Sequence, residues 1–250
     1  LLHNPDVKGY MSEAVWEGMR EVKDAGLTEQ VGIAPGPANG FTLDMLLCME
    51  KFADTIDWAM VILNPLEPWP GGLLLPAAEQ FGIKVITRVV DHGGLFHGDV
   101  LPGHQFAEGD HRVYRPAGWV ERGNEKIERM REVADQHGVS LLQLACLWNL
   151  AHPAVESVIP TLIQEAGQDA KTIEAKLDDL AALSEICLMP EERNFITNIG
   201  NNKGCMDLKG ANPNFEGPEE LPDRWGLQPG HKEAGERWGI VPEQDLVCTM

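Results

Sequence analysis

The sequence predicts an α/β protein in which parallel strands form part of a (β/α)8 TIM barrel. Short apolar segments alternate with amphipathic ones along most of the chain, the pattern of βα units that build a parallel sheet. No glycine-rich dinucleotide fingerprint follows any apolar segment, which disfavours a doubly wound sheet. Five strands can be counted, whereas a closed barrel has about eight. We therefore expect a barrel truncated to about its last five βα units, followed by a C-terminal extension.

Five segments have the character of strands. Continuous apolar runs are typical of strands covered on both faces, and the runs that begin at Asp57 and Ile83 are the clearest. The expected strands are 1–3, 30–35, 57–65, 83–90 and 155–160. A polar loop of about 28 residues follows the fourth of them.

Helical periodicity marks the segments between the strands. Met11, Val15, Met19 and Val22 fall on one face of the first expected helix, and Gly26 is suited to end it. The expected helices are 11–26, 42–54, 119–138, 140–151, 169–183 and 190–200, with a short helix in 71–82 that is broken near Pro76. Their alternation with the strands is what favours a parallel sheet.

Composition narrows the classes of partner and compartment. The 250 residues carry a formal net charge of −19, which disfavours nucleic acid and anionic membranes as partners. Five cysteines lie far apart with no CxxC pair, which argues against a disulfide framework and favours the cytoplasm. No apolar run reaches the roughly 18 residues of a membrane span. We expect a cytoplasmic protein that acts on a small molecule and can form a homo-oligomer.

One long segment carries a specific pattern. Asp110-His111-Arg112 gives a D-x-R just before an expected helix, residues 134–153 read A-x-x-H-G-V-S-L-x-Q-L-A-x-x-W-x-L-A-H-P, and residues 155–160 read V-x-S-V-I-P. This segment resembles the aldo-keto reductase family. Weaker matches in QVGIAP, VILNPLEP and VITRVVDHGGLF resemble the family's fifth, sixth and seventh strands, and LLHNPD resembles its fourth. The resemblance implies a (β/α)8 barrel that binds a nicotinamide cofactor across its carboxyl face.

The resemblance covers part of the chain. Residues 1–204 correspond to a partial barrel whose first three βα units are absent, so we expect an incomplete copy. Residues 205–250 form a C-terminal extension. Because the extension contains Trp225 and Trp238, which disordered segments avoid, we expect one of these rings to pack on the barrel or on a partner subunit.

By the resemblance, His3 is the catalytic residue. The family's histidine at this strand end belongs to a tetrad with Asp, Tyr and Lys, and its imidazole would orient a substrate carbonyl. The other members normally lie on the first three units, so we expect the isolated chain to be inactive. The implied activity is reduction of an aldehyde or ketone with NADPH, or with NADH. The alternative is a catalytically silent barrel that senses nucleotide or serves as an interaction subunit.

The nicotinamide site departs from the family pattern. Ala34 and Pro35 replace the Ser-Asn pair that holds the nicotinamide amide, and neither side chain can form a hydrogen bond. Arg88 stands where an aromatic ring usually stacks on the nicotinamide, although a guanidinium can also stack as a plane. These departures favour either a cofactor held by other groups or weak nicotinamide binding.

The phosphate site also departs from the pattern. Thr161 replaces a glycine at the start of the loop where backbone N–H groups hold the adenosine phosphates in the family. Lys171 and Lys176 are the available cations, and Lys176 falls where the family has an asparagine. We expect one of them to lie near the 2′-phosphate of NADP; otherwise both belong to a solvated helix face.

Two further residues are candidates for the substrate pocket. Trp69 follows the third strand and would form an aromatic wall, or else is a packed loop residue. His92 opens the polar loop 91–118, which also holds three other histidines among acidic residues. Their spacing matches no compact ligand motif, so we expect a substrate-facing loop without a metal.

Overall fold

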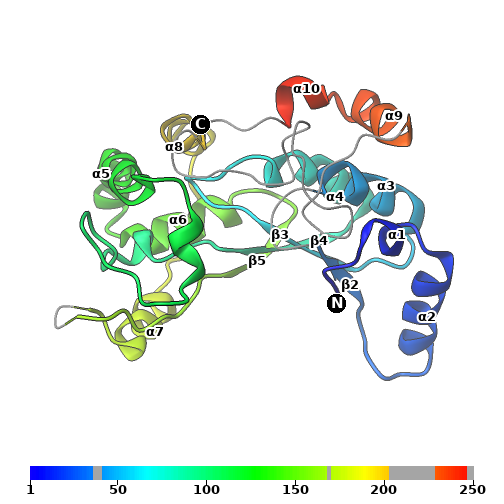
Figure 1. The fold of residues 1–250 in the computed structure, drawn as a ribbon, viewed down its shortest axis with the longest axis horizontal. Helices are drawn as coiled ribbons and strands as arrows, with labels where there is room; N and C mark the ends of the chain where they lie inside the picture. Colours follow the sequence, from blue (N-terminus) through cyan, green and yellow to red (C-terminus); the bar gives the residue numbers. More distant parts are fainter. Residues whose placement is uncertain (36–40, 168–169, 203–228, 247–250) are drawn as a thin grey trace.

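The strands form a single parallel sheet. The computed structural model describes residues 1–35, 41–167, 170–202 and 229–246. Its strands are β1 (Leu2–His3), β2 (Gly32–Ala34), β3 (Trp58–Ile62), β4 (Lys84–Arg88) and β5 (Val155–Ile159). They pair in the order β1-β2-β3-β4-β5, all parallel (Figure 1). The predicted α/β class and the five parallel strands in chain order are confirmed.

The register brings the carboxyl ends of the strands to one edge. His3 pairs with Ala34, and the last residue of β3, Ile62, pairs with Arg88. Arg88 in turn pairs with Ile159 across a sheet that has an irregularity near Val85. Residues that directly follow the strands therefore lie along this edge. In (β/α)8 barrels the active site lies at the carboxyl ends of the strands.

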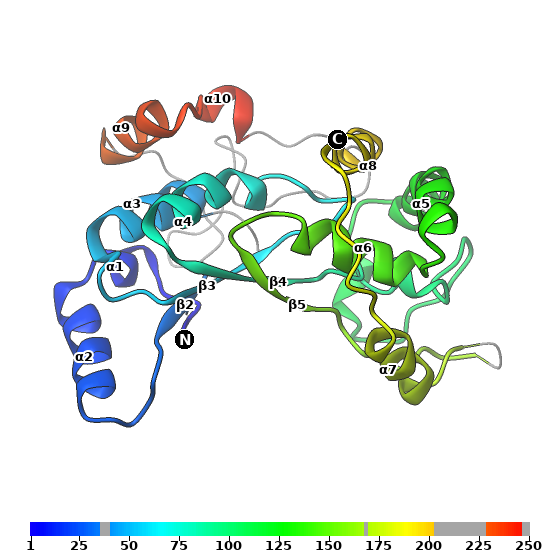
Figure 2. The same ribbon diagram turned by 180° about the vertical axis from the view of Figure 1, so that it is seen from behind.

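The described residues also form helices around the sheet. They are α1 (Val7–Tyr10), α2 (Glu13–Asp24), α3 (Thr42–Phe52), α4 (Leu75–Phe81), α5 (Trp119–His137), α6 (Leu141–Leu150), α7 (Ile173–Ala181), α8 (Pro190–Gly200), α9 (Pro229–Trp238) and α10 (Pro242–Asp245). Figures 1 and 2 show α3, α4 and α6 on the same side of the strands, with α8 beside α5. The apolar sides of these helices and the strands enclose the core, which includes the buried rings of Trp16 and Trp148.

Local signals explain several helix ends. The Ser12 hydroxyl accepts a hydrogen bond from Val15 N and begins α2, while Ser140 and Gln143 form a reciprocal capping box at α6. Gly138 ends α5 in the left-handed region at φ 65°, which a residue without a Cβ adopts freely. The expected break near Pro76 is a change from a 3-10 helix, η1 (Gly71–Leu74), to α4, and the proline lies in the first turn of α4.

The C-terminal helices lie on the outside of α3. Trp238 at the end of α9 packs edge-on against Phe81 of α4, with ring centroids 6.0 Å apart. Its indole N–H donates to Glu50 of α3 at 2.9 Å, and Arg237 also binds Glu50. Trp225 lies outside the described residues, and the division of the chain at residue 204 stays a prediction.

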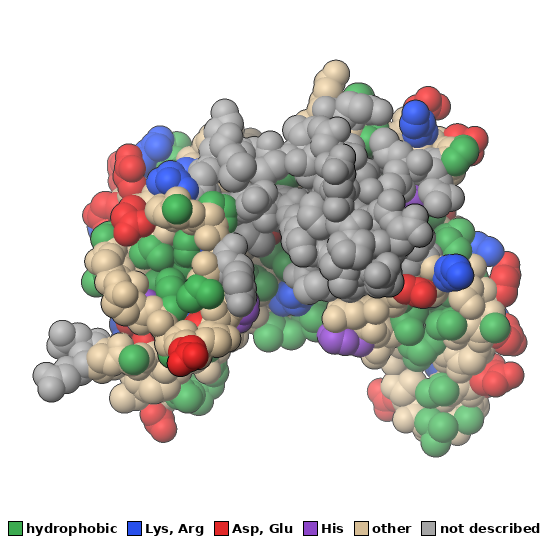
Figure 3. Space-filling view, in the orientation of Figure 1, with side chains coloured by type: hydrophobic (Ala, Val, Ile, Leu, Met, Phe, Trp, Pro, Cys, Tyr) green, Lys and Arg blue, Asp and Glu red, His purple; other side chains and the backbone are tan. Residues whose placement is uncertain are grey.

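The outer edges of the sheet lack partner strands in the part of the chain that the structure describes. That these strands are the last five of an eight-stranded barrel stays a prediction. Figure 3 shows acidic side chains at both ends of the visible face, so the negative charge is not gathered into one patch there. Within the described ranges, no helix combines the length and the apolar character needed to cross a membrane.

Candidate functional site

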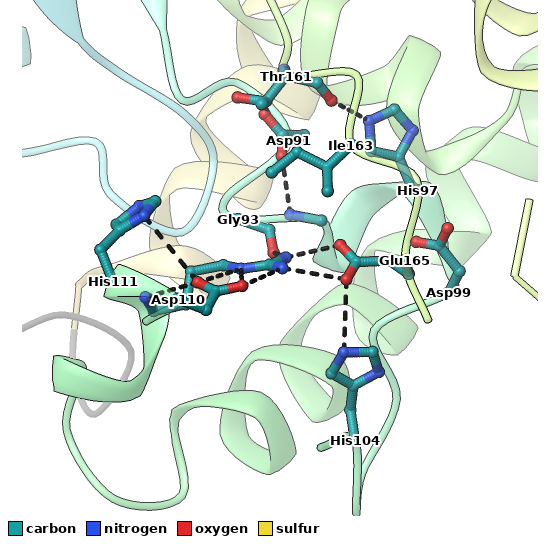
Figure 4. A network of polar contacts seen from close by, with 12 residues as sticks. Asp91, Gly93, His97, Asp99, His104, Asp110, His111, Thr161, Ile163 and Glu165 are labelled. Carbon is teal, nitrogen blue, oxygen red and sulfur yellow. Dashed lines mark hydrogen bonds and ion pairs between the residues drawn. The ribbon is translucent and has the colours of Figure 1, made fainter. Parts of the chain in front are cut away.

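Two loops meet at the carboxyl edge beside β4 and β5. The first runs from Val89 to Gly118 and includes the 3-10 helices η2 (Leu95–His97) and η3 (His111–Tyr114). The second follows β5 and leads to α7. Figure 4 shows side chains from both loops pointing toward one another. We call these the β4 loop (residues 89–118) and the β5 loop (the described residues 160–167 and 170–172).

A carboxylate ties the two loops together through their backbones. Asp91 is buried, and its Oδ2 accepts a hydrogen bond from Gly94 N at 2.7 Å. Its Oδ1 accepts from Thr161 N, also at 2.7 Å. Both oxygens of one carboxylate are therefore bound to N–H groups, one from each loop.

A buried arginine forms the second tie. Arg112 Nη1 and Nη2 donate to the two oxygens of Glu165 at 2.6 and 3.0 Å. The same guanidinium binds Asp110 and the carbonyl of Gly93. Burial alone would lower the pKa of Arg112. The hydrogen bonds to Asp110 and Glu165 outweigh this effect, so the pKa of Arg112 is raised. The Arg112 side chain in turn lowers the pKa of Asp110 to about 2.

Both predicted phosphate-binding lysines are engaged within this site. Lys176 is only 1% exposed; its Nζ lies 2.7 Å from Asp99 Oδ2 and donates to the carbonyl of Ile163 at 2.6 Å. Lys176 therefore does not lie on a solvated helix face. Lys171 is exposed, and its Nζ donates to the carbonyl of His97 at 2.5 Å. The phosphate role of either lysine stays a prediction.

His97 links Thr161 and Lys171 through hydrogen bonds of its ring and its carbonyl. Its Nε2 lies 2.8 Å from the carbonyl oxygen of Thr161, which fixes a donating Nε2–H because a carbonyl can only accept. Burial lowers the pKa of His97, and the nearby Lys176 acts in the same direction. His97 is thus favoured as a neutral ring inside the site.

Arginines and aromatic rings form a series of contacts between the β4 loop and the start of α5. Arg112 lies 4.6 Å over the ring of Phe106, which stacks on Trp119 at 5.8 Å. Arg115 lies 4.5 Å from the ring centroid of Trp119. Cation–π contacts of this kind add stability where the cation is desolvated. These contacts therefore hold Arg112 in place for its pair with Glu165.

A second charged cluster lies at the ends of β3 and β4. Glu67 is fully buried, and desolvation raises its pKa to about 7 against the opposing charges of Arg115 and Arg88. Asn64 Nδ2 donates to Glu67 Oε2 at 3.4 Å. Burial also lowers the pKa of Arg88, and the charge of Glu67 opposes this. The predicted cofactor residue Arg88 thus faces a carboxyl group.

The predicted catalytic residue lies at the same edge but apart from these clusters. His3 is exposed at the end of β1, where it pairs with Ala34, and its side chain forms no hydrogen bond or ion pair within the described ranges. The edge placement of His3, Arg88 and Thr161 follows from the parallel register. Pro35 is buried directly after β2.

The two predicted pocket residues occupy different environments. Trp69 is half-buried; its backbone N–H and carbonyl are both bound by the side chain of Asn202. It lines a cavity of about 330 Å³ together with Asn198 and Gln244. His92 is fully buried with φ 47°, edge-on to Trp119.

The four histidines of the β4 loop do not converge. His97 contacts the β5 loop, His104 lies 3.4 Å from Glu165, and the side chain of His111 is 84% exposed. Over the described ranges, no group of three or more His, Cys, Asp or Glu side chains is arranged to hold a metal ion.

Sequence reasoning missed the acids that organise the site. Asp91 and Glu165 belong to no sequence motif. Asp91 binds a residue 70 positions away in the sequence, and Glu165 binds one 53 positions away, so their roles depend on how the two loops meet. A signal did exist for Arg112, because it is the arginine of the D-x-R pattern.

The donors at this site are of the kind that a dinucleotide needs. Proteins hold phosphate oxygens with backbone N–H groups and with cations. This site has two such N–H groups, those of Gly94 and Thr161, and a cation, Lys171. In this structure each of them is bound to an acceptor of the chain itself. The donor set therefore fits a dinucleotide phosphate, provided that the chain's own acceptors give way.

Comparisons with known proteins agree with this architecture. Versiconal hemiacetal acetate reductase of Aspergillus parasiticus is 23% identical over 150 residues, or 60% of this chain and 33% of that protein. A glycerol dehydrogenase of Gluconobacter oxydans has the same fold, with a TM-score of 0.64 and 17% identity over 86% of this chain and 61% of that one. An aldo/keto reductase of Klebsiella pneumoniae in complex with NADP and acetate gives a TM-score of 0.52 and 16% identity, over 83% of this chain and 60% of that one.

The chain spans a third of the length of the curated relative and about 60% of the length of these solved structures. A sequence model of the aldo/keto reductase family matches residues 1–180, which is most of the chain. This match includes β1 to β5 and both loops of the site. The chain belongs to the aldo/keto reductase family.

Proposed function

We propose that the whole protein is an NADP(H)-dependent oxidoreductase that reduces an aldehyde or ketone to an alcohol, or oxidises the alcohol. The observation that carries this proposal is the alignment of His3, Arg88 and Thr161 along the carboxyl edge of one parallel sheet in a chain of this family. In barrels the reacting groups lie at this edge. NAD remains an alternative cofactor, and the particular carbonyl compound is open.

The roles of this chain's residues follow from their chemistry. His3, which is exposed at the end of β1, would donate a ring N–H to the substrate carbonyl oxygen and steady the growing negative charge there. Gly94 N, Thr161 N and Lys171 would hold phosphate oxygens, and Arg88 would lie against the nicotinamide as a planar cation. When bound, the nicotinamide supplies or accepts the hydride.

A second candidate function keeps the nucleotide but not the chemistry. The substitutions Ala34, Pro35 and Arg88 remove side chains that hold the nicotinamide in the family pattern, and the phosphate donors are bound internally. These observations favour a catalytically silent barrel that senses nucleotide or acts as an interaction subunit. A homo-oligomer stays a prediction for both functions.

The test uses NADPH binding and carbonyl turnover together. NADPH fluorescence is titrated with the whole protein, and its NADPH consumption is followed with a panel of small aldehydes and ketones. The variants are His3→Gln and, as the matched control, His111→Gln, whose side chain is 84% exposed. Turnover lost only in His3→Gln supports the oxidoreductase. Binding without turnover supports the nucleotide-sensing silent barrel, and absence of NADPH binding contradicts both the oxidoreductase and the nucleotide sensor.

A further inference from the structure

Two N–H groups from separate loops converge on Asp91. Gly94 N and Thr161 N each lie 2.7 Å from a different oxygen of this carboxylate, which is 1% exposed. Gly94 has φ 98°, and an added Cβ would lie 2.7 Å from Val100 Cγ2. A side chain at this position would thus be strained and crowded. Because Gly94 has no side chain, its backbone can come close to an anion. In this structure that anion is the Asp91 carboxylate.

The other positive groups of the two loops are also bound to acceptors of the chain. Arg112 forms two hydrogen bonds with Glu165, and both side chains are less than 5% exposed. Lys176 lies against Asp99, and Lys171 is bound to the carbonyl of His97. The cations that an incoming anion would use are therefore already bound to carboxylate or carbonyl oxygens of the chain.

We propose that Asp91 is a built-in competitor for the phosphate groups of a dinucleotide, and that the Arg112–Glu165 pair holds the β4 and β5 loops in this closed arrangement. A phosphate oxygen has the charge and the lone pairs of a carboxylate oxygen, so it can accept the same two N–H groups. Binding then requires the Asp91 side chain to turn away from Gly94 and Thr161. The dinucleotide as ligand rests on the proposed function; the competition itself does not.

A purely structural role for Asp91 makes the opposite prediction. If the carboxylate only fastens the loops, its removal loosens the N–H groups, and an anion then binds more weakly. If Asp91 competes, its removal exposes two donors that lack an acceptor, and an anion binds more tightly because it no longer has to displace a charged group. The sign of the change in affinity separates the two.

The experiment is isothermal titration calorimetry with inorganic pyrophosphate and, separately, with NADP⁺. Wild type is compared with Asp91→Ala and with Glu108→Ala, which makes the same change in net charge at an exposed residue of the β4 loop. We expect Asp91→Ala to bind pyrophosphate at least about tenfold more tightly than wild type, and Glu108→Ala to stay within about twofold. Equal or weaker binding by Asp91→Ala overturns the proposal.

A second variant covers the case in which Asp91→Ala does not fold. Asp91→Asn keeps the volume and one acceptor but removes the charge, and tighter pyrophosphate binding than in Glu108→Ala supports the competition. Binding no tighter than in that control overturns it. If pyrophosphate binding tightens while NADP⁺ binds to no variant, the competition holds and the proposed function fails. If wild type reduces carbonyls with NADPH and Asp91→Ala binds no more tightly, the function holds and this inference fails.

Discussion

Arg112 and Glu165, which are 53 residues apart in sequence, form a bidentate pair at 2.6 and 3.0 Å. The side chains are 3% and 4% exposed. A guanidinium suits this arrangement because its planar fork matches both oxygens of a carboxylate. The pair closes the contact between the β4 and β5 loops at the carboxyl edge of the sheet.

Truncation of this pair is expected to be costly. Arg112→Ala leaves the Glu165 carboxylate buried without its partner, which should lower the free energy of unfolding by about 3–5 kcal/mol. Arg131→Ala is the matched control, because Arg131 pairs with Glu128 on the exposed surface of α5, where solvent screening leaves such a pair little effect on stability. Urea denaturation of the variants measures both changes. Equal losses in the two variants would contradict the role given to the buried pair.

Glu67 is expected to make the stability depend on pH. Its pKa is raised to about 7 in the folded protein, mainly by burial, whereas an unfolded glutamate titrates near 4.5. The folded state therefore binds more protons between these values, so this contribution to stability is full below pH 4.5 and is lost as the pH rises through about 7. Glu67→Gln should remove about 3 kcal/mol of this pH dependence. Urea denaturation at pH 5 and pH 8 measures it, and an unchanged dependence in Glu67→Gln would exclude Glu67 as its source.

The two lysines are expected to respond differently to substitution. Lys171→Ala removes an exposed cation near the β5 loop and should weaken NADPH binding about fivefold while leaving NADH binding unchanged. Lys176→Ala leaves Asp99 buried without its cation, so the expected loss is one of stability, about 3–5 kcal/mol. Titration of both nucleotides and thermal unfolding distinguish these outcomes. Unchanged NADPH affinity in Lys171→Ala would remove this residue from the cofactor site.

The C-terminal helices are expected to stabilise the fold through Trp238. Trp238→Ala removes the contact with Phe81 and the hydrogen bond to Glu50, which should cost about 2–3 kcal/mol. Phe195→Ala, at a 45% exposed position on α8, serves as the control and should cost less than about 1 kcal/mol. Chemical denaturation measures both. Equal small losses would mean that α9 contributes little to stability.

Much of the fold could be predicted because the signals are local. The apolar runs around Ala59 and Val85 read directly as buried strands, and Ser140 marks the start of α6. The arrangement of the site could not be read in the same way. Asp91 acquires its role only when the ends of β4 and β5 lie side by side and bring Thr161 N within 2.7 Å.

Lys176 shows why side-chain roles were harder to predict than strands. Its position in α7 is compatible with a solvated face or with a phosphate contact, because a lysine is usually exposed. Asp99 is buried opposite it, and the two charges make burial of the lysine tolerable. No local pattern links residues so far apart in sequence, so the pair becomes visible only in three dimensions.

The proposed function depends on the binding of a dinucleotide at the β4 and β5 loops. Hydrogen–deuterium exchange with and without saturating NADPH tests it most directly, because it locates binding without requiring turnover. We expect NADPH to change the exchange of the amides of residues 91–98 and 161–165, because Gly94 and Thr161 must release Asp91. Unchanged exchange in both segments at saturating NADPH, or changes confined to other parts of the chain, would contradict it.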